Sequence, residues 1–140
     1  MSAGVAVRGA SATDVAAVLA LWVDADAAVS ATDDASSVAG LIAHQASRLF
    51  LAEADGILVG TVIATWDGWR GGIYRLAVLP GWRRRGVARF LVRRCEEHLR
   101  ALGCRRVGAL VLHQEDQAVG FWQAMGYERD GRIVRYVADL

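Results

Sequence analysis

The segment that decides the fold reads Val78-Leu79-Pro80-Gly81-Trp82-Arg83-Arg84-Arg85-Gly86-Val87-Ala88. It joins a run with β-strand character to the clearest helical pattern in the chain. A helix N-terminus presents unpaired N–H groups and a partial positive charge, so it favours a phosphate where the backbone can be approached closely. Gly86 and Ala88 supply that access, and the three preceding arginines add donors for charge-assisted hydrogen bonds. The segment therefore predicts a phosphate site between a strand and a helix.

A helix is predicted directly after this segment. Apolar residues recur at helical spacing while charged residues cover the opposite face, and the apolar set is Val87, Phe90, Leu91, Cys95, Leu99 and Leu102. Gly103 follows the last of them and is a natural C-terminal cap.

Three antiparallel strands are predicted before the segment. Their apolar, β-rich runs are Leu49–Ala54, Ile57–Trp66 and Ile73–Leu79. Asp55-Gly56 and Asp67-Gly68 separate these runs, and Asp-Gly is typical of tight hairpin turns. Two hairpins therefore lead into the phosphate segment.

The N-terminal part predicts one strand and two helices. Alternation around Val5 and Val7 indicates the strand, and apolar residues from Val15 to Trp22 at helical spacing indicate the first helix. A polar segment, Asp24 to Ser37, precedes a second short helix from Val38 to Ala46.

The C-terminal part predicts a strand, a helix and a last hairpin. The strand is the apolar run Val107–Leu112, the helix is Gln117–Met125, and the hairpin is Tyr127–Val137 with its turn at Asp130-Gly131. The element order βααβββαβαββ predicts an α/β (α+β) fold with a mixed, mostly antiparallel sheet flanked by helices. With 140 residues and 54% apolar composition, residues 1–140 are expected to form a single domain.

Composition argues against several classes of function. Sixteen basic and fifteen acidic residues leave a net charge of +1, so the overall balance does not call for nucleic acid or an anionic membrane. The longest uncharged apolar stretch is too short to span a bilayer, which predicts a soluble, cytoplasmic protein. The two cysteines are expected to be buried thiols, and the three histidines lack metal-ligand spacing, so no metal site is expected.

The arginine segment resembles a family motif. Residues Arg83 to Ala88 match the Arg/Gln-x-x-Gly-x-Gly/Ala motif of the GNAT superfamily of N-acetyltransferases. A second family segment, Asn-x-x-Ala-x-x-Phe-Tyr-x-x-x-Gly-Phe, is matched with substitutions by Glu115, Ala118, Phe121, Trp122, Gly126 and Tyr127. The chain most resembles the small stand-alone bacterial members of that superfamily.

The resemblance implies acetyl-CoA as co-substrate and a small-molecule or peptide amine as acceptor, and it is compatible with a homodimer. It places the cofactor against Leu76, Ala77, Val78, Arg83, Arg84, Arg85, Gly86, Val87, Ala88, Arg89, Glu115, Phe121 and Trp122. The backbone N–H of Val78 would stabilise the oxyanion formed at the thioester. No covalent enzyme intermediate is implied, so neither cysteine is needed as a nucleophile.

The acid and the base of the reaction are less well defined. Trp122 stands where many relatives carry a tyrosine that protonates the departing thiolate, and an indole N–H is not a useful acid. Glu115 replaces the usual asparagine, and a carboxylate favoured by a helix N-terminus explains it equally. Candidate bases are Asp67 and Asp24 or Asp26, although Asp67 also fits a turn residue and water can take the proton. The candidate catalytic residues are thus Val78, Tyr74, Asp67 and Trp122.

An acceptor pocket is predicted around the second hairpin turn. The residues that would line it are Trp66, Asp67, Trp69, Arg70 and Tyr74, and hairpin packing explains their aromatic rings equally well. Two other functions remain open: a non-catalytic acyl-CoA-binding module, suggested by Trp122 and the missing base, and a nucleic-acid-binding protein that uses the arginines.

Overall fold

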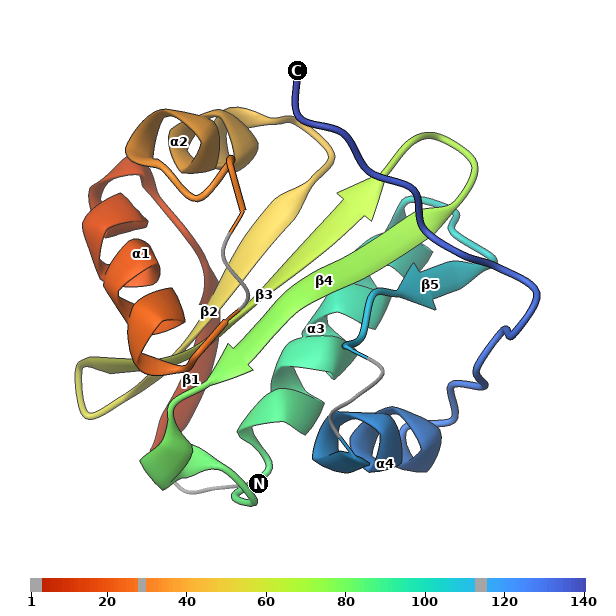
Figure 1. Ribbon diagram of the computed structural model, residues 1–140. Coiled ribbons are helices and arrows are strands. Elements are labelled where there is room, and N and C mark those ends of the chain that lie inside the picture. The colour runs from red at the N-terminus through yellow and green to blue at the C-terminus, as the bar shows by residue number, and fades with distance from the viewer. Residues whose placement is uncertain (1–3, 28–29, 113–115) are drawn as a thin grey trace. The chain divides into compact units, whose positions relative to one another are not determined.

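The computed structural model describes residues 4–27, 30–112 and 116–140 (Figure 1). It contains two compact units, Met1–Leu110 and Val111–Leu140, which are described separately. The first unit holds β1 (Val5–Gly9), α1 (Val15–Asp24), α2 (Ala35–Ala43), β2 (Arg48–Ala54), β3 (Ile57–Trp66), β4 (Gly71–Val78), α3 (Val87–Ala101) and β5 (Val107–Ala109). The second unit holds α4 (Asp116–Ala124).

The first unit is built on a five-stranded sheet with the order β1-β2-β3-β4-β5. The first three pairings are antiparallel, and β5 pairs with β4 in parallel. Asp55 and Gly56 both adopt left-handed backbone angles, with φ of 52° and 77°, as a two-residue hairpin turn requires. The mixed, mostly antiparallel α/β fold expected from the sequence is confirmed.

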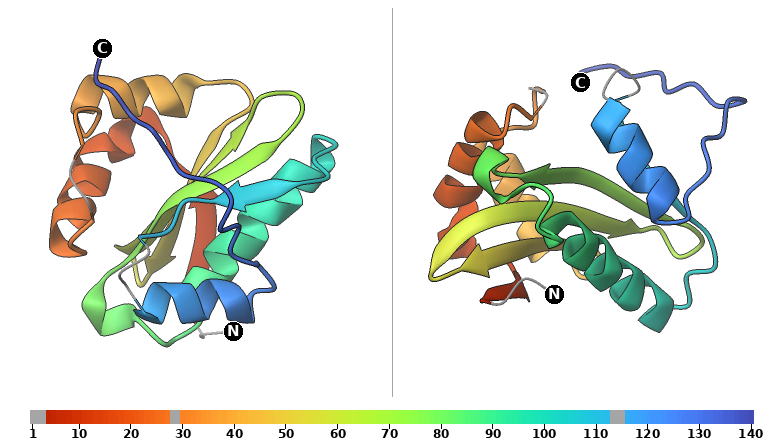
Figure 2. Two further views of the ribbon diagram at one scale, coloured as in Figure 1. Left: turned by 45° about the vertical axis from the view of Figure 1, so that its right-hand side comes forward. Right: turned by 90° about the horizontal axis from the view of Figure 1, so that it is seen from below.

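Helices cover both faces of this sheet (Figure 2). Leu49 and Leu51 of β2 belong to the apolar cluster that α1 and α2 close, whereas Phe50 between them packs its ring edge-on to His98 of α3. Because side chains alternate along a strand, α1 and α2 lie on one face and α3 lies on the other. Gly71 allows α3 to approach closely, since a Cβ there would lie 2.9 Å from the Leu99 side chain.

The register of β4 against β3 changes at one point. Ile63 pairs with Tyr74, but Thr61 pairs with Ala77, so that two residues of β4, Arg75 and Leu76, lie opposite one residue of β3. This is a β-bulge, in which one strand has an extra residue. Relative to a regular strand, every residue after the bulge directs its backbone N–H to the opposite edge. Arg75 adopts φ of 54°, a left-handed conformation that is uncommon outside glycine.

The predicted last hairpin is wrong. Residues 127–140 contain no strand, and their apolar side chains Ile133, Val134, Tyr136 and Val137 are exposed. The predicted turn residue Asp130 accepts hydrogen bonds from the backbone N–H and the guanidinium of Arg132 instead of closing a hairpin. A two-stranded hairpin is marginal unless one face is buried, and this segment buries neither face.

None of the helices in the described residues is both long enough and apolar enough to cross a bilayer.

Candidate functional site

The central feature of the site is an open edge of β4. The short strand β5 pairs only with Gly71, Gly72 and Ile73, and the hydrogen bond from Leu110 N–H to Ile73 O, at 3.0 Å, follows the last pair. Figure 1 shows β5 beside the beginning of β4 alone. Among the described residues of the sheet, the part of β4 from Tyr74 to Val78 therefore has no strand on this side. An extended ligand can pair with it as an added strand.

The bulge decides which amide faces this open edge. The carbonyl of Ile73 faces β5, so in a regular strand the N–H of Val78, five residues later, would face β3. The extra residue in the bulge reverses this direction. Leu79 N–H donates to Val59 O on β3 at 2.9 Å, and Val78 N–H consequently points to the open edge. This is the direction that the predicted oxyanion donor requires.

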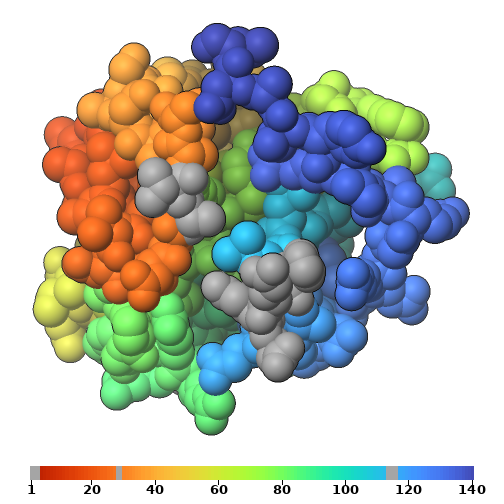
Figure 3. Space-filling model, viewed as in Figure 1, coloured from red at the N-terminus to blue at the C-terminus, as the bar shows by residue number. Residues whose placement is uncertain are grey.

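The loop after β4 is fixed by Arg83. Its guanidinium donates to the carbonyl oxygen of Val78 at 3.1 Å and to that of Ala25, just beyond α1, at 3.3 Å. In Figure 3 the light-green surface of this loop lies against the orange surface at the end of α1. Arg83 thus holds the loop in place through backbone carbonyls, a structural task that its predicted role as a phosphate ligand did not include.

The N-terminus of α3 is open to a ligand. Gly86 is the N-cap with φ of 84°, and no side chain caps the helix. The first helical hydrogen bond runs from Phe90 N–H to Gly86 O at 3.1 Å. The N–H groups of the first turn, Val87 to Arg89, therefore precede the helical bonding pattern and are placed to receive an anion.

Two further arginines flank this helix end. Arg84 adopts φ of 63°, and the guanidinium carbon of Arg85 lies 4.8 Å from the centre of the Trp82 ring. A cation over an aromatic face is attracted by the ring, so Trp82 braces Arg85 beside the helix N-terminus. Two exposed positive charges next to open amides favour a phosphate group there.

The hydrogen bonds that the Asp67 carboxylate accepts make it a weaker base. Its Oδ1 accepts the backbone N–H groups of Arg70 at 2.7 Å and Trp69 at 2.8 Å. These two hydrogen bonds, the one from Arg70 first, lower the pKa of the Asp67 carboxyl below its usual value. A carboxylate with a lowered pKa takes up a proton less readily. The turn interpretation of Asp67 fits this geometry better than the catalytic one.

The predicted acceptor cluster is divided in the structure. Trp69 is exposed at the hairpin turn, where its ring stacks with the Arg70 guanidinium at 4.1 Å. Tyr74 lies opposite Ile63, three cross-strand pairs beyond the first pair after the turn, Trp66 with Gly71, and packs against the cluster beneath α1 and α2. At about 3.3 Å per residue, Tyr74 is about 10 Å along the sheet from that first pair, and Trp69 lies beyond it in the turn.

Arg75 is a residue of β4 that no sequence motif marks as part of the site. Its guanidinium pairs with Asp33 at 2.8 Å and lies over the Trp22 ring at 4.8 Å. Trp22 Nε1 also donates to Thr61 Oγ1 at 2.9 Å, and Thr61 Oγ1 donates to the carbonyl oxygen of Arg75 at 3.3 Å. The only signal in the sequence is a charged residue within an otherwise apolar strand.

The second unit contains the other predicted site residues. In α4 the rings of Phe121 and Trp122 meet edge-on with centroids 5.4 Å apart, and Trp122 meets Tyr127 at 4.9 Å. Trp122 is buried. Glu115 lies outside the described residues.

Cys95 is buried and poorly suited to act as a nucleophile, and Cys104, which was also expected to be buried, is only partly buried. Burial, with a smaller contribution from the neighbouring Glu96 charge, raises the pKa of the Cys95 thiol to about 12. Cys104 donates from Sγ to the carbonyl of Arg106 at 3.2 Å. With so high a pKa, the Cys95 thiol is almost entirely protonated near neutral pH and is therefore a poor nucleophile.

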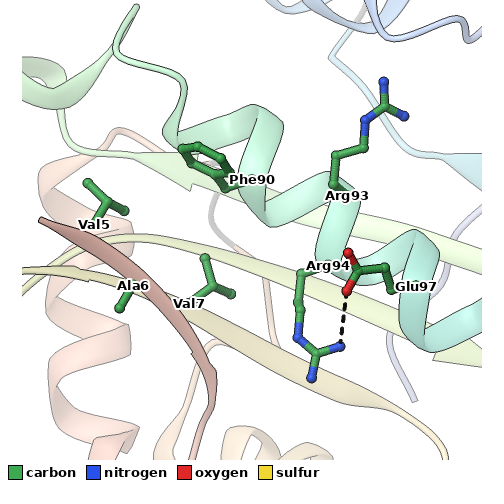
Figure 4. A pocket seen from close by; sticks show the side chains of 7 residues that line it. All are labelled: Val5, Ala6, Val7, Phe90, Arg93, Arg94 and Glu97. Carbon is green, nitrogen blue, oxygen red and sulfur yellow. Dashed lines mark ion pairs between the residues drawn. The ribbon is translucent and has the colours of Figure 1, made fainter. Parts of the chain in front are cut away.

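A separate hollow lies at the other edge of the sheet, between β1 and α3 (Figure 4). It has a volume of about 330 Å³ and is lined by Val5, Ala6, Val7, Phe90, Arg93, Arg94 and Glu97. Since β1 and β5 are opposite edges of the sheet, this hollow is distinct from the open edge of β4.

Comparison with known proteins assigns the family. The model of the acetyltransferase (GNAT) family matches residues 15–127. This chain belongs to the GNAT acetyltransferase family. The match includes the open edge of β4, the arginine loop and α4. Acetyl-CoA is accordingly its co-substrate, as the motif predicted, and the open edge and the uncapped end of α3 fit an extended ligand that carries phosphates.

Solved structures show the same fold. An aminoglycoside N-acetyltransferase in complex with CoA has a TM-score of 0.77 at 22% identity, with 97% of this chain and 95% of that chain covered. An acetyltransferase predicted in Clostridium acetobutylicum and solved with acetyl-CoA has a TM-score of 0.79 at 11% identity, covering 95% and 96%. Glucosamine-6-phosphate N-acetyltransferase from Arabidopsis thaliana has a TM-score of 0.78 at 12% identity, covering 96% and 99%.

Proposed function

We propose that this GNAT protein transfers the acetyl group of acetyl-CoA directly to a primary amine, with both substrates bound together. The observation that carries the proposal is the direction of Val78 N–H. It points to an open strand edge at the start of the loop that leads to the uncapped N-terminus of α3. One edge can thus hold an extended arm and aim one donor at its thioester, while the helix end holds phosphates.

The cofactor roles follow the order of these features along the chain. Backbone groups from Leu76 to Val78 pair with the pantetheine arm, and amides of residues 84 to 89 hold the pyrophosphate. We also assign Phe121 and Trp122 to cofactor binding, because they match the second family motif. Because the family model spans both compact units, we also propose that residues 1–140 act as one domain.

In the reaction, the neutral amine nitrogen attacks the carbonyl carbon of the thioester. Val78 N–H donates to the oxygen on which negative charge develops, and loss of one such donor typically costs about 10²–10³-fold in rate. The carbon–sulfur bond then breaks, and the sulfur leaves with the bonding electrons. An N–C bond replaces the S–C bond, so no enzyme nucleophile is needed.

Water takes the proton lost by the amine in this proposal. The carboxylate of Asp67 is already held by two backbone N–H groups, and its lowered pKa weakens it as a base. The leaving thiol has a pKa near that of free cysteine, about 8.5, so it can depart as a thiolate without an acid from Trp122. Turnover should therefore rise with pH as more of the amine becomes neutral.

The test is thiol release from acetyl-CoA with a panel of amines. The panel contains sisomicin, which is bound in the structure of a similar aminoglycoside acetyltransferase from a soil metagenomic sample, and glucosamine 6-phosphate, after which the similar Arabidopsis enzyme is named, together with spermidine and an alanyl peptide. The chain contains no lysine, so mass spectrometry separates acetylation of an added amine from acetylation of the protein, whose only primary amine is the N-terminus. An acetylated amine supports the proposal. Calorimetric binding of acetyl-CoA with no transfer to any amine would instead favour the acyl-CoA-binding module.

A further inference from the structure

Residues from other elements contact both the backbone carbonyl and the side chain of Arg75. Its carbonyl accepts the Thr61 hydroxyl, which itself accepts the Trp22 indole N–H. Its guanidinium lies over the same indole and pairs with Asp33 between α1 and α2. Trp22 and Thr61 are buried, so the contact with the Arg75 carbonyl lies inside the molecule, whereas the pair of Arg75 with Asp33 is only partly buried, with 17% and 19% of the two side chains exposed.

Two features of Arg75 are unfavourable for folding. Its φ of 54° places a residue with a Cβ in the left-handed region, which is strained outside glycine. One guanidinium nitrogen, Nη1, is buried without a hydrogen-bond partner among the described residues. Neither feature serves stability, and strained residues of this kind concentrate at functional sites.

The position of Arg75 determines the direction of Val78 N–H. Arg75 is the residue at which β4 gains its extra position, and that extra position turns Val78 N–H from β3 to the open edge. We infer that Trp22, Thr61 and Asp33 lock the bulge at Arg75, which makes Arg75 a positioning residue for the Val78 oxyanion donor. This inference rests on the proposed function only for its effect on turnover, since the lock itself is a property of the fold.

Replacing Arg75 with glycine and with alanine separates its backbone role from its side-chain role. Both changes remove the guanidinium and leave the backbone carbonyl that accepts the Thr61 hydroxyl. Glycine adopts the left-handed angle without strain, whereas alanine keeps the strain and loses the contacts to Asp33 and Trp22 that oppose it. The bulge should therefore stay at residue 75 in R75G, whereas in R75A it should no longer be fixed there. We expect R75A to lower kcat by about tenfold or more, as a misaimed oxyanion donor would, with a much smaller change in KM for acetyl-CoA. R75G should stay within about threefold of the parent.

Asp33 and Asp34 provide a matched pair of changes in the same segment. Asp33 contacts Arg75, whereas Asp34 caps α2 by accepting Ser37 N–H at 2.7 Å. Asparagine caps helices about as well as aspartate, so D34N should leave kcat unchanged. D33N should lower kcat in the same direction as R75A. R75K, which keeps a cation near Asp33 and Trp22, should recover part of the loss.

Amide hydrogen exchange tests the lock without any turnover. In the folded parent and in R75G, Leu79 N–H should be protected by Val59 O, while Val78 N–H exchanges readily in the absence of ligand. In R75A this contrast should shrink, because the unbulged register pairs Val78 N–H with β3. Equal exchange patterns and equal kcat values in folded R75A and R75G would overturn the inference. If the parent acetylates no amine, the exchange pattern still decides it, and only the proposed function fails.

Discussion

Gly86 offers the most direct test of the phosphate site at the N-terminus of α3. Its φ of 84° favours glycine, so a side chain there is strained by about 1–2 kcal/mol. A Cβ would meet only Phe90 Cε2, at 3.7 Å, which is an ordinary contact. The fold should therefore survive Gly86→Val with a modest loss of stability. The added methyl groups would cover the amides of the first helical turn, and we expect acetyl-CoA affinity to fall by about tenfold or more.

Gly103 provides the matched control at the other end of the same helix. Its φ of 94° imposes the same strain, and a Cβ there would meet nothing within 4 Å. Gly103→Val should cost similar stability in thermal unfolding and leave acetyl-CoA affinity, measured by calorimetry, unchanged. Equal affinities of the two variants at a temperature where both are folded would refute the phosphate site at Gly86.

Three more predictions concern the cofactor loop and the two doubtful catalytic residues. Replacing Arg84 and Arg85 together by glutamine should weaken CoA binding about tenfold and leave binding of a phosphate-free pantetheine unchanged; equal losses for both ligands would argue against phosphate contacts, and Arg83 is kept because it holds the loop. Asp67→Asn should preserve turnover and its pH profile, since an amide oxygen can accept the same turn hydrogen bonds, and a collapse of kcat would restore Asp67 as a base. Trp122→Tyr, assayed where it stays folded, should release thiol at least as fast as the parent, and a collapse of turnover with acetyl-CoA affinity and melting temperature unchanged would reveal a role for Trp122 in catalysis or acceptor binding.

Local signals in the sequence were sufficient for most of the fold. Asp55-Gly56 specifies its hairpin because only a few residue types accept two successive positive φ angles. The stripe of α3 and its flanking glycines likewise define a helix without reference to the rest of the chain. The arginine loop could be recognised for the same reason, since its residues are contiguous.

The structural features that the sequence did not predict depend on distant parts of the chain. The segment Tyr127–Val137 has strand-like residues, but a strand needs a partner edge and a buried face, and neither is encoded within the segment. The bulge at Arg75 depends on Trp22, Asp33 and Thr61, which lie 14 to 53 residues away in sequence. The open edge of β4 similarly results from the short pairing with β5, whereas the apolar run Val107–Leu112 predicted a longer strand.

The central claim is that the open edge of β4 and the N-terminus of α3 bind acetyl-CoA, and an amide NMR titration tests it most directly. On addition of acetyl-CoA to the labelled protein, the largest shift changes are predicted at the amides of Val78 and of Val87 to Arg89. Changes centred instead on Val5 to Val7, beside the hollow between β1 and α3, with Val78 and the start of α3 unaffected, would contradict the account.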